Sequence, residues 1–256
     1  MIHHTAIIDK TAEVSESAII GPNVFIGKNC IIHDNVQIGV NSVIEENTEI
    51  KKGTILSPNV HVGGAPQDLS YKGEDTKLVI GENCRIREFT TIHRASTKED
   101  WITEVGNNCF IMNSVHIAHD CKIGNNVIMT SYAALAGHTH VGDRAVISGL
   151  TGTHQFVRIG KMAMVGGMSR ITKDVPPYCL IEGNPAIVHG LNIVGLRRNG
   201  VGPEARSSLK KALAIFLDRS LLLEDAIAEI EKLTGCDEVV EFCEFLKSSK
   251  RGITRR

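Results

Sequence analysis

The chain has few aromatic residues and almost no net charge, and both features narrow its function. Aromatic residues are only 4% of its 256 residues, so we do not expect a core built on clustered rings. The 28 Lys and Arg nearly balance the 29 Asp and Glu, which leaves a formal net charge of −1. No overall basic field is therefore available to attract nucleic acid or an anionic membrane.

The sequence also shows no pattern typical of a membrane span, a signal peptide or a disulfide framework. No apolar run approaches the length of a span, and MIHHTAIIDK lacks a basic-then-apolar order. The seven cysteines are an odd, irregularly spaced set, which favours a reducing, cytoplasmic location. Apolar residues are 42% of the chain, which is typical of a folded domain and excludes disorder.

What the chain has instead is an aliphatic residue at every sixth position. The register is lost after Val62, returns over residues 80–92, and runs again over residues 105–171 with one gap. The fifth position of each unit is small, and glycine often follows the aliphatic slot. A period of six matches neither an α-helix nor a half-buried strand. It fits a solenoid whose aliphatic residues fill the interior, with glycine at tight corners.

Four of the cysteines occupy the small slot, where we expect core filler and not a zinc or redox site. They are Cys30, Cys84, Cys109 and Cys121.

The period resembles that of the hexapeptide acyltransferases, which fold as a left-handed parallel β-helix with 18 residues per triangular coil. The resemblance implies an all-β helix over residues 1–190, with loop excursions near 63–79 and 93–104. Its left hand departs from the usual right-handed crossover and comes from the resemblance alone. Flat faces packed around a threefold axis imply a homotrimer with active sites between neighbouring copies.

Prolines and a change of composition mark the end of the repeat. Pro176, Pro177 and Pro185 cannot donate to a ladder, so the repeat is expected to stop there. From Pro203 onward, apolar residues at helical spacing predict three helices, and residues 191–256 are expected to form a small α-helical domain. The basic end KSSKRGITRR is expected to be solvated.

Histidines gather in one in-phase stretch, HIAHDC, LAGHTH and THQF. Steps of 18 residues lead from His119 to Gly137 and then to Gln155, so these three are predicted to stack over about 10 Å of one face. Such a face could line a groove for a sugar. The other histidines of this cluster are His116, His138 and His154.

Three interpretations of the cluster stay open on the residues alone. The histidines could be scattered over the solvent-facing surface, or they could bind zinc, as in the β-helical carbonic anhydrases. The third interpretation is proton transfer around a nucleotide sugar. It is favoured because Asp120 directly follows His119, and a carboxylate can tune a histidine as a general base.

Six motifs together carry a closer resemblance that spans the chain: PQDL, HIAHDC, LAGH, HQF, DVPPY and GLNIVGLRR. They resemble the acyl-[acyl-carrier-protein]:UDP-N-acetylglucosamine O-acyltransferase family, which begins lipid A biosynthesis. The resemblance implies transfer of a 3-hydroxyacyl group to the sugar 3-position. No metal and no cofactor are implied, because the donor is carried on the phosphopantetheine of acyl carrier protein. Some members form an amide on a 3-amino UDP-sugar, and this alternative stays open.

The same resemblance implies a role for individual residues. His119 matches the general base, Asp120 the residue that orients it, and Gly137 the backbone N–H that stabilises the oxyanion. Gly167, with Met168 beside it, matches the position that measures acyl-chain length. The implied substrate-binding residues are Gln67, Asp68, His116, His138, His154, Gln155, Asn192 and Arg198.

Two positions depart from the family pattern. Ser70 follows PQDL where the family often has lysine, and Lys72 could take its place two residues later. Val194 replaces a glutamate that usually helps to fix the nucleotide end of the substrate.

Acyl carrier protein is strongly acidic, so basic residues late in the repeat or just past it are expected to receive it. These candidates are Arg158, Arg170, Lys173, Arg197 and Arg198.

Overall fold

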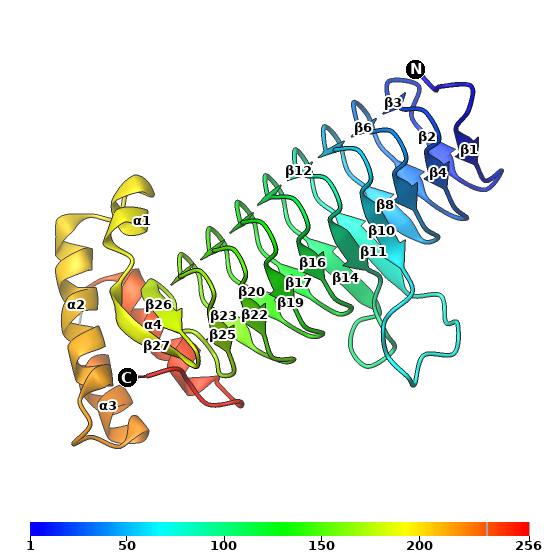
Figure 1. The fold of residues 1–256 in the computed structure, drawn as a ribbon. Coiled ribbons are helices and arrows are strands. Elements are labelled where there is room, and N and C mark those ends of the chain that lie inside the picture. Colours follow the sequence, from blue (N-terminus) through cyan, green and yellow to red (C-terminus); the bar gives the residue numbers. More distant parts are fainter. Residues whose placement is uncertain (234, 256) are drawn as a thin grey trace.

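The computed structural model describes residues 1–233 and 235–255, and shows a long three-sided prism capped at one end by helices (Figure 1). Successive strands go to successive faces, so each turn of the chain adds one short strand to each of three sheets. Pairing within the prism is parallel, and partners such as Ile26 and Ile44 lie 18 residues apart. The predicted left-handed parallel β-helix is confirmed.

The strands of each face have the following bounds. The first sheet contains β1 (Ile7–Ile8), β4 (Phe25–Ile26), β7 (Val43–Ile44), β10 (His61–Gly64), β13 (Thr91–His93), β16 (His116–Ile117), β19 (Ala134–Leu135), β22 (Gly152–Thr153) and β25 (Arg170–Ile171). The second contains β2 (Glu13–Val14), β5 (Ile31–Ile32), β8 (Thr48–Ile50), β11 (Lys77–Ile80), β14 (Ile102–Val105), β17 (Lys122–Ile123), β20 (His140–Val141) and β23 (Arg158–Ile159). The third contains β3 (Ile19–Ile20), β6 (Gln37–Ile38), β9 (Ile55–Leu56), β12 (Arg85–Ile86), β15 (Phe110–Ile111), β18 (Ile128–Met129), β21 (Val146–Ile147), β24 (Met164–Val165), β26 (Cys179–Gly183) and β27 (Ala186–Leu191).

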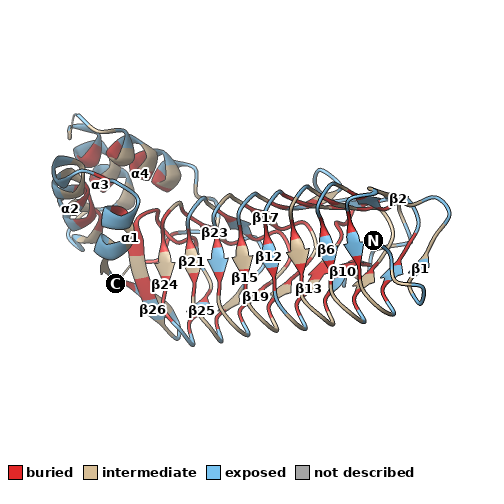
Figure 2. Cartoon of the chain, turned by 90° about the horizontal axis from the view of Figure 1, so that it is seen from above, coloured by how far each residue is buried: buried red, intermediate tan, exposed pale blue. Residues whose placement is uncertain are grey.

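The aliphatic slot fills the interior of the prism, as the period predicts. Ile26, Ile44 and Ile86 are fully buried, and Figure 2 shows a buried stripe on each coil along the length of the prism. The four small-slot cysteines are also buried, and none is in a disulfide. The interior is therefore one continuous column of small and aliphatic side chains.

Glycine and asparagine have separate roles at the corners. A Cβ on Gly39 would lie 2.5 Å from the backbone nitrogen of Pro58 on the next coil, so this glycine is required by close stacking of coils. The left-handed backbone lies two residues later, where asparagine is common, as at Asn23 (φ 53°) and Asn41 (φ 59°). The sequence prediction assigned the turn to glycine, whereas the strained conformation belongs to the asparagine.

Two loops leave the prism from the same corner, between the first and second sheets (Figure 1). Residues 65–76 follow β10, and residues 94–101 follow β13 on the next coil. Arg94 is 4% exposed and ties them together, because it donates to the backbone oxygen of Gly63 (2.8 Å) and to the hydroxyl of Tyr71 (3.0 Å). The next coils place residues 118–121, 136–139 and 154–157 at this corner.

The third sheet continues past the proline-rich segments, where the six-residue repeat ends, as far as Leu191. β26 pairs parallel with β24, and β27 then pairs antiparallel with β26. Pro176 and Pro177 lie in the corner before β26, and Pro185 lies in the turn before β27. All three prolines lie outside the strands, where no ladder hydrogen bond requires an N–H, so they do not interrupt the sheet.

Four helices follow the strands: α1 (Ile193–Arg198), α2 (Pro203–Leu217), α3 (Leu223–Glu231) and α4 (Asp237–Lys247). Leu209, Phe216 and Phe242 are fully buried and join the core of the prism. The three longer helices match the predicted apolar spacing, whereas α1 was not predicted. Among the described residues, no helix is long and apolar enough to cross a membrane.

The basic C-terminal segment is packed against the prism, and the expectation of a solvated end was wrong for its described residues. Asp174 and Ile253 form a parallel bridge, and Ile253 is 7% exposed. Asp174 also accepts a hydrogen bond from Ser249 (2.8 Å), and Arg255 donates to the backbone oxygen of Phe216 (2.9 Å). The segment therefore returns to the last coils of the β-helix.

Candidate active site

A cavity of about 400 Å³ lies along the first sheet and the corner from which the two loops leave. Five of the predicted site residues line it: Gln67, His116, His119, Gly137 and Gln155. Gln67 comes from the first loop, and the others come from three successive coils. The 18-residue step therefore places together the residues that it predicts to stack.

His119 and Asp120 form a hydrogen-bonded pair at the wall of this cavity. Nδ1 of His119 lies 2.7 Å from Oδ2 of Asp120, which is fully buried. Burial opposes ionisation of Asp120, but hydrogen bonds from His119 and Ser96 outweigh it and lower its pKa. An ionised carboxylate only accepts, so Nδ1 of His119 is a protonated nitrogen, and in the neutral ring Nε2 keeps its lone pair. In that tautomer Nε2 can accept a proton.

Gly137 lies against the His119 ring, with almost no space between them. A Cβ on Gly137 would be 2.6 Å from Cε1 and 2.8 Å from Nε2 of His119. Its backbone conformation is not in the left-handed region, so the glycine is required by the approach of the ring and not by the turn. Within residues 1–233 and 235–255, the Gly137 N–H donates to no protein acceptor.

His116 lines the cavity from β16, on the same coil as the pair and three residues before His119. Its Nδ1 lies 2.8 Å from the Thr91 hydroxyl on the preceding coil. Burial, with added repulsion from His93 and His119, lowers the pKa of His116. His116 is therefore a neutral polar contact at the cavity and not a cationic one.

His138 faces a neighbouring cavity of about 590 Å³ on the other side of the corner. It is 4% exposed and stacks on Phe156, with ring centroids 4.3 Å apart. Its Nδ1 lies 3.0 Å from Oε1 of Glu99. The structure thus separates His138 from the cavity that His119 lines, although the two rings are edge to face at 5.3 Å.

His119, Asp120 and His138 also offer the donor atoms of a potential metal site, all within 4.8 Å of one another. Oδ2 of Asp120, however, already accepts hydrogen bonds from His119 and from the Ser96 hydroxyl (2.7 Å). A metal ion bound to that oxygen would displace these donors, so the arrangement fits the hydrogen-bonded pair better than zinc.

His154 is exposed and contacts the C-terminal segment. Nη2 of Arg251 lies 2.6 Å from its Nδ1, and a guanidinium can only donate. Nδ1 is therefore the acceptor in this contact. This contact could not be predicted from a local pattern, because 97 residues separate its partners.

Asp68 is engaged by a neighbouring loop. Its Oδ2 lies 2.5 Å from Nζ of Lys98, and its Oδ1 accepts hydrogen bonds from the N–H and hydroxyl of Ser70. These contacts, led by the hydrogen bond from Lys98, lower the pKa of Asp68. The cation beside Asp68 is thus Lys98, which comes from the second loop.

Asn192 and Arg198 lie apart from the cavity within one chain. Asn192 caps α1 and donates to the backbone oxygen of Met162, at the corner between the second and third sheets. Arg198 is exposed at the end of the same helix. Neither lines the cavity that holds His119.

Gly167 and Met168 lie at the third corner of the prism, where the chain passes to β25. Met168 is 74% exposed and has a left-handed backbone (φ 55°). A Cβ on Gly167 would lie 3.4 Å from the backbone oxygen of Gly149 and 4.0 Å from Cβ of Ser148, which are ordinary contact distances. The position can therefore accept a side chain.

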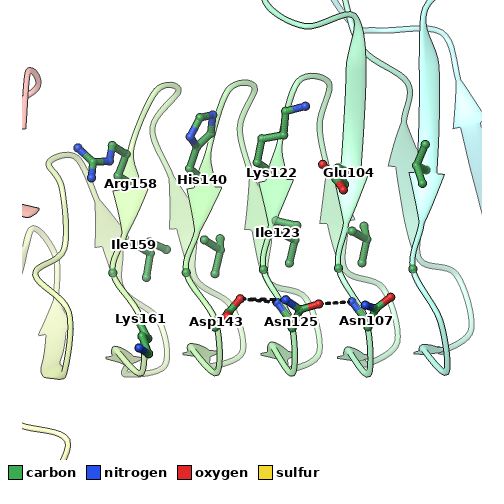
Figure 3. Close-up of a pocket in the computed structure, with 18 of the residues that line it drawn as sticks. Glu104, Asn107, Lys122, Ile123, Asn125, His140, Asp143, Arg158, Ile159 and Lys161 are labelled. Carbon is green, nitrogen blue, oxygen red and sulfur yellow. Dashed lines mark hydrogen bonds between the residues drawn. The ribbon is translucent and has the colours of Figure 1, made fainter. Parts of the chain in front are cut away.

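A larger groove, of about 630 Å³, runs along the second sheet, and Figure 3 shows its floor. Glu104, Lys122, His140 and Arg158 form one row, with one residue from each coil. None of the residues implied in catalysis, substrate binding or chain-length measurement lines this groove. The largest of these three cavities therefore does not contain the residues that the resemblance implies, whereas the cavity beside His119 does.

Sequence reasoning missed the residues that hold the site from outside the repeat. Ser96 donates to Asp120, and the Thr103 hydroxyl accepts the backbone N–H of Asp120 (2.8 Å). Both lie in or beside the second loop. Their only sequence signal was that the period of six stops there.

A hydrogen-bonded His–Asp pair in a cavity of a parallel β-helix places the chain among the hexapeptide-repeat transferases. Family models agree: residues 102–137 match "Bacterial transferase hexapeptide (six repeats)", and residues 174–254 match "Udp N-acetylglucosamine O-acyltransferase; Domain 2". Residues 2–65 match the GMPPB C-terminal domain.

Individual relatives are similar over most of the chain. The acyl-[acyl-carrier-protein]–UDP-N-acetylglucosamine O-acyltransferase of Thermodesulfovibrio yellowstonii is 48% identical over 199 residues, 77% of each chain. That of Burkholderia mallei (strain SAVP1) is 43% identical over 76% of each. The crystal structure of UDP-N-acetylglucosamine O-acyltransferase from Moraxella catarrhalis RH4 has a TM-score of 0.96 at 41% identity and 99% coverage of both chains. The chain belongs to this acyltransferase family.

Proposed function

We propose that the chain transfers a 3-hydroxyacyl group from acyl carrier protein to the 3-hydroxyl of UDP-N-acetylglucosamine. Family membership supports the reaction, because relatives at 43–48% identity carry this activity in their names. The observation that carries the mechanism is the His119–Asp120 pair, whose free Nε2 lies at the cavity beside Gly137.

The proposed step is a direct attack without a covalent enzyme intermediate. The sugar 3-oxygen attacks the thioester carbon while Nε2 of His119 takes its proton. Asp120 stabilises the imidazolium that forms, and the Gly137 N–H donates to the oxyanion of the tetrahedral intermediate. When the carbon–sulfur bond breaks, the imidazolium returns the proton to the departing phosphopantetheine thiolate. No further cofactor and no metal are needed for this balance.

The test is an assay with purified protein, UDP-N-acetylglucosamine and a series of 3-hydroxyacyl-acyl carrier proteins. We expect an ester at the sugar 3-position and release of the carrier thiol. A product formed only from a 3-amino UDP-sugar would identify the amide-forming alternative. If the protein held stoichiometric zinc, and chelation removed both the zinc and the activity, the carbonic-anhydrase-type interpretation would be favoured instead. Family membership argues against that interpretation.

We also propose a homotrimer in the cytoplasm. The support is the separation of the implied substrate residues within one chain: Asn192 and Arg198 lie at a different corner from His119. A neighbouring copy could bring these residues to the cavity. Light scattering at the mass of three chains would agree, and a monomer with full activity would contradict it.

Gly167 is expected to set the acyl-chain preference. The position lies 48 residues, between two and three coils, beyond His119, or roughly 10–14 Å along the axis at the strand spacing. Without a side chain, Gly167 leaves room for a long chain, and each buried methylene contributes about 0.8 kcal/mol, roughly fourfold in binding. Gly167→Met should therefore shift the preference to shorter donors. Turnover over a series of chain lengths measures this, and an unchanged optimum would remove Gly167 from chain selection.

Four exposed basic residues are expected to receive the acidic carrier protein: Arg170, Lys173, Arg197 and Arg198. Arg158 is less suited, because its guanidinium donates to Ser248 and lies 4.4 Å from the Phe245 ring centroid. Exposed charges are screened by salt, so the donor KM should rise with ionic strength. A donor KM that is indifferent to salt, measured beside the KM for UDP-sugar, would contradict this docking surface.

A further inference from the structure

The second loop contacts three of the implied site residues within four positions of sequence. Ser96 contacts Asp120, Lys98 contacts Asp68, and Glu99 lies 3.0 Å from His138. We call Ser96, Lys98 and Glu99 the clasp. It leaves the prism one coil before His119, at the same corner, so it is placed to reach the dyad, the first loop and the next coil.

Ser96 supplies most of the hydrogen bonds that Asp120 receives. Its backbone N–H is shared between Oδ1 (3.1 Å) and Oδ2 (3.0 Å), and its hydroxyl donates to Oδ2 at 2.7 Å. Nδ1 of His119 donates to the same Oδ2. Ser96 is 2% exposed and Asp120 fully buried, so no water competes for these bonds. The direction of the carboxylate, and with it the angle of the imidazole, is thus set by Ser96.

Lys98 acts on the other wall of the cavity. Its ammonium binds Asp68, directly after Gln67, which lines the cavity from the first loop. The Lys98 side chain is 51% exposed, but the Asp68 side chain is only 11% exposed, so the pair joins a largely covered carboxylate to a half-exposed ammonium. The pair therefore ties the first loop to the second loop.

We propose that the clasp positions the two halves of the acceptor site: Ser96 sets the His119–Asp120 pair for proton transfer, and Lys98 sets the first loop for sugar binding. The inference rests on the proposed function of His119. Ser96 and Lys98 are positioning residues, since each acts through another side chain.

The Ser96 arm is tested with Ser96→Ala, Ser96→Thr and the exposed neighbour Thr97→Ala as control. Removal of one hydrogen bond to a buried carboxylate should lower kcat by about ten- to a hundredfold with the KM for UDP-sugar unchanged. Ser96→Thr keeps the hydroxyl and should restore most of the rate. Full kcat in Ser96→Ala, or equal losses in both Ser96 variants, would overturn the role of the hydroxyl.

A readout without turnover separates this inference from the proposed function. The Nδ1 proton of His119, followed by NMR in ¹⁵N-histidine-labelled protein, should shift in Ser96→Ala and remain in place in Ser96→Thr. If the resonance does not move in Ser96→Ala, Ser96 does not position the His119–Asp120 pair. This result would hold whichever substrate the protein acylates. Failure of the wild type to acylate UDP-N-acetylglucosamine would overturn only the proposed function.

The Lys98 arm has its own variant and control. Lys98→Met should raise the KM for UDP-sugar with kcat unchanged, whereas Lys10→Met, an exposed lysine at the far end of the prism, should alter neither. An unchanged KM in Lys98→Met would remove Lys98 from the clasp.

Discussion

Alanine in place of His119 is expected to lower kcat by about 10²–10⁴-fold, the usual contribution of a general base. The reason lies in the protonation state that the structure implies. Asp120 accepts the Nδ1 proton, so Nε2 is free to take the proton of the sugar hydroxyl. Among residues 1–233 and 235–255, no other side chain that lines this cavity is hydrogen-bonded to a buried carboxylate that could stabilise the cation.

The fold should survive this substitution, which makes the result interpretable. Asp120 loses the bond from His119 but keeps the hydroxyl and N–H bonds from Ser96. Steady-state kinetics would be compared with thermal unfolding, and with His4→Ala as an exposed histidine control. Near-normal turnover by His119→Ala would exclude the residue from proton transfer, and a large loss of stability would show that it acts through the fold.

The architecture of the prism could be predicted because one side chain in six has to fill its interior. That requirement leaves an aliphatic period that no helix or ordinary strand produces. The ends of the repeat follow other rules. The β26–β27 hairpin depends on contacts with β24, and α1 is too short to show a helical period. Neither element was predicted, because neither carries a periodic signal.

The catalytic corner could be predicted only where the coils are uninterrupted. No insertion separates His119, Gly137 and Gln155, so steps of 18 residues find one stack. The same arithmetic fails across the loops. Ser96 lies 24 residues before Asp120 and contacts it all the same, because the second loop lengthens that coil.

Contacts made by the chain end carry no local signal at all. Arg251 reaches His154 across 97 residues, and the composition of the tail suggested a solvated segment. Two of its basic residues instead donate to backbone oxygens of the same chain. Nε of Arg251 lies 3.1 Å from the oxygen of Thr172, and Nε of Arg255 lies 2.9 Å from that of Phe216. The charge of the tail predicted contact with water and gave no indication of these intramolecular partners.

Gly137→Ala is expected to lower kcat by about a hundredfold with little change in stability. The new Cβ would lie 2.6 Å from Cε1 of His119, so the ring has to retreat by roughly 1 Å to reach normal contact. Misplacement of a reacting group by about 1 Å costs about 10²-fold in rate. The alanine keeps the N–H that is proposed for the oxyanion, so the loss would report on the position of the base alone.

Stability should hardly change, for two opposing reasons. The backbone of Gly137 is open to alanine, which lowers the entropy of the unfolded chain and stabilises by about 0.4–1 kcal/mol. The strained contact with a movable, partly exposed ring offsets this gain. Gly202→Ala, whose Cβ meets open space at φ −64°, is the matched control. In a His119→Ala background the ring is gone, so Gly137→Ala should cost nothing further. An additive loss in the double variant would show that Gly137 acts independently of His119.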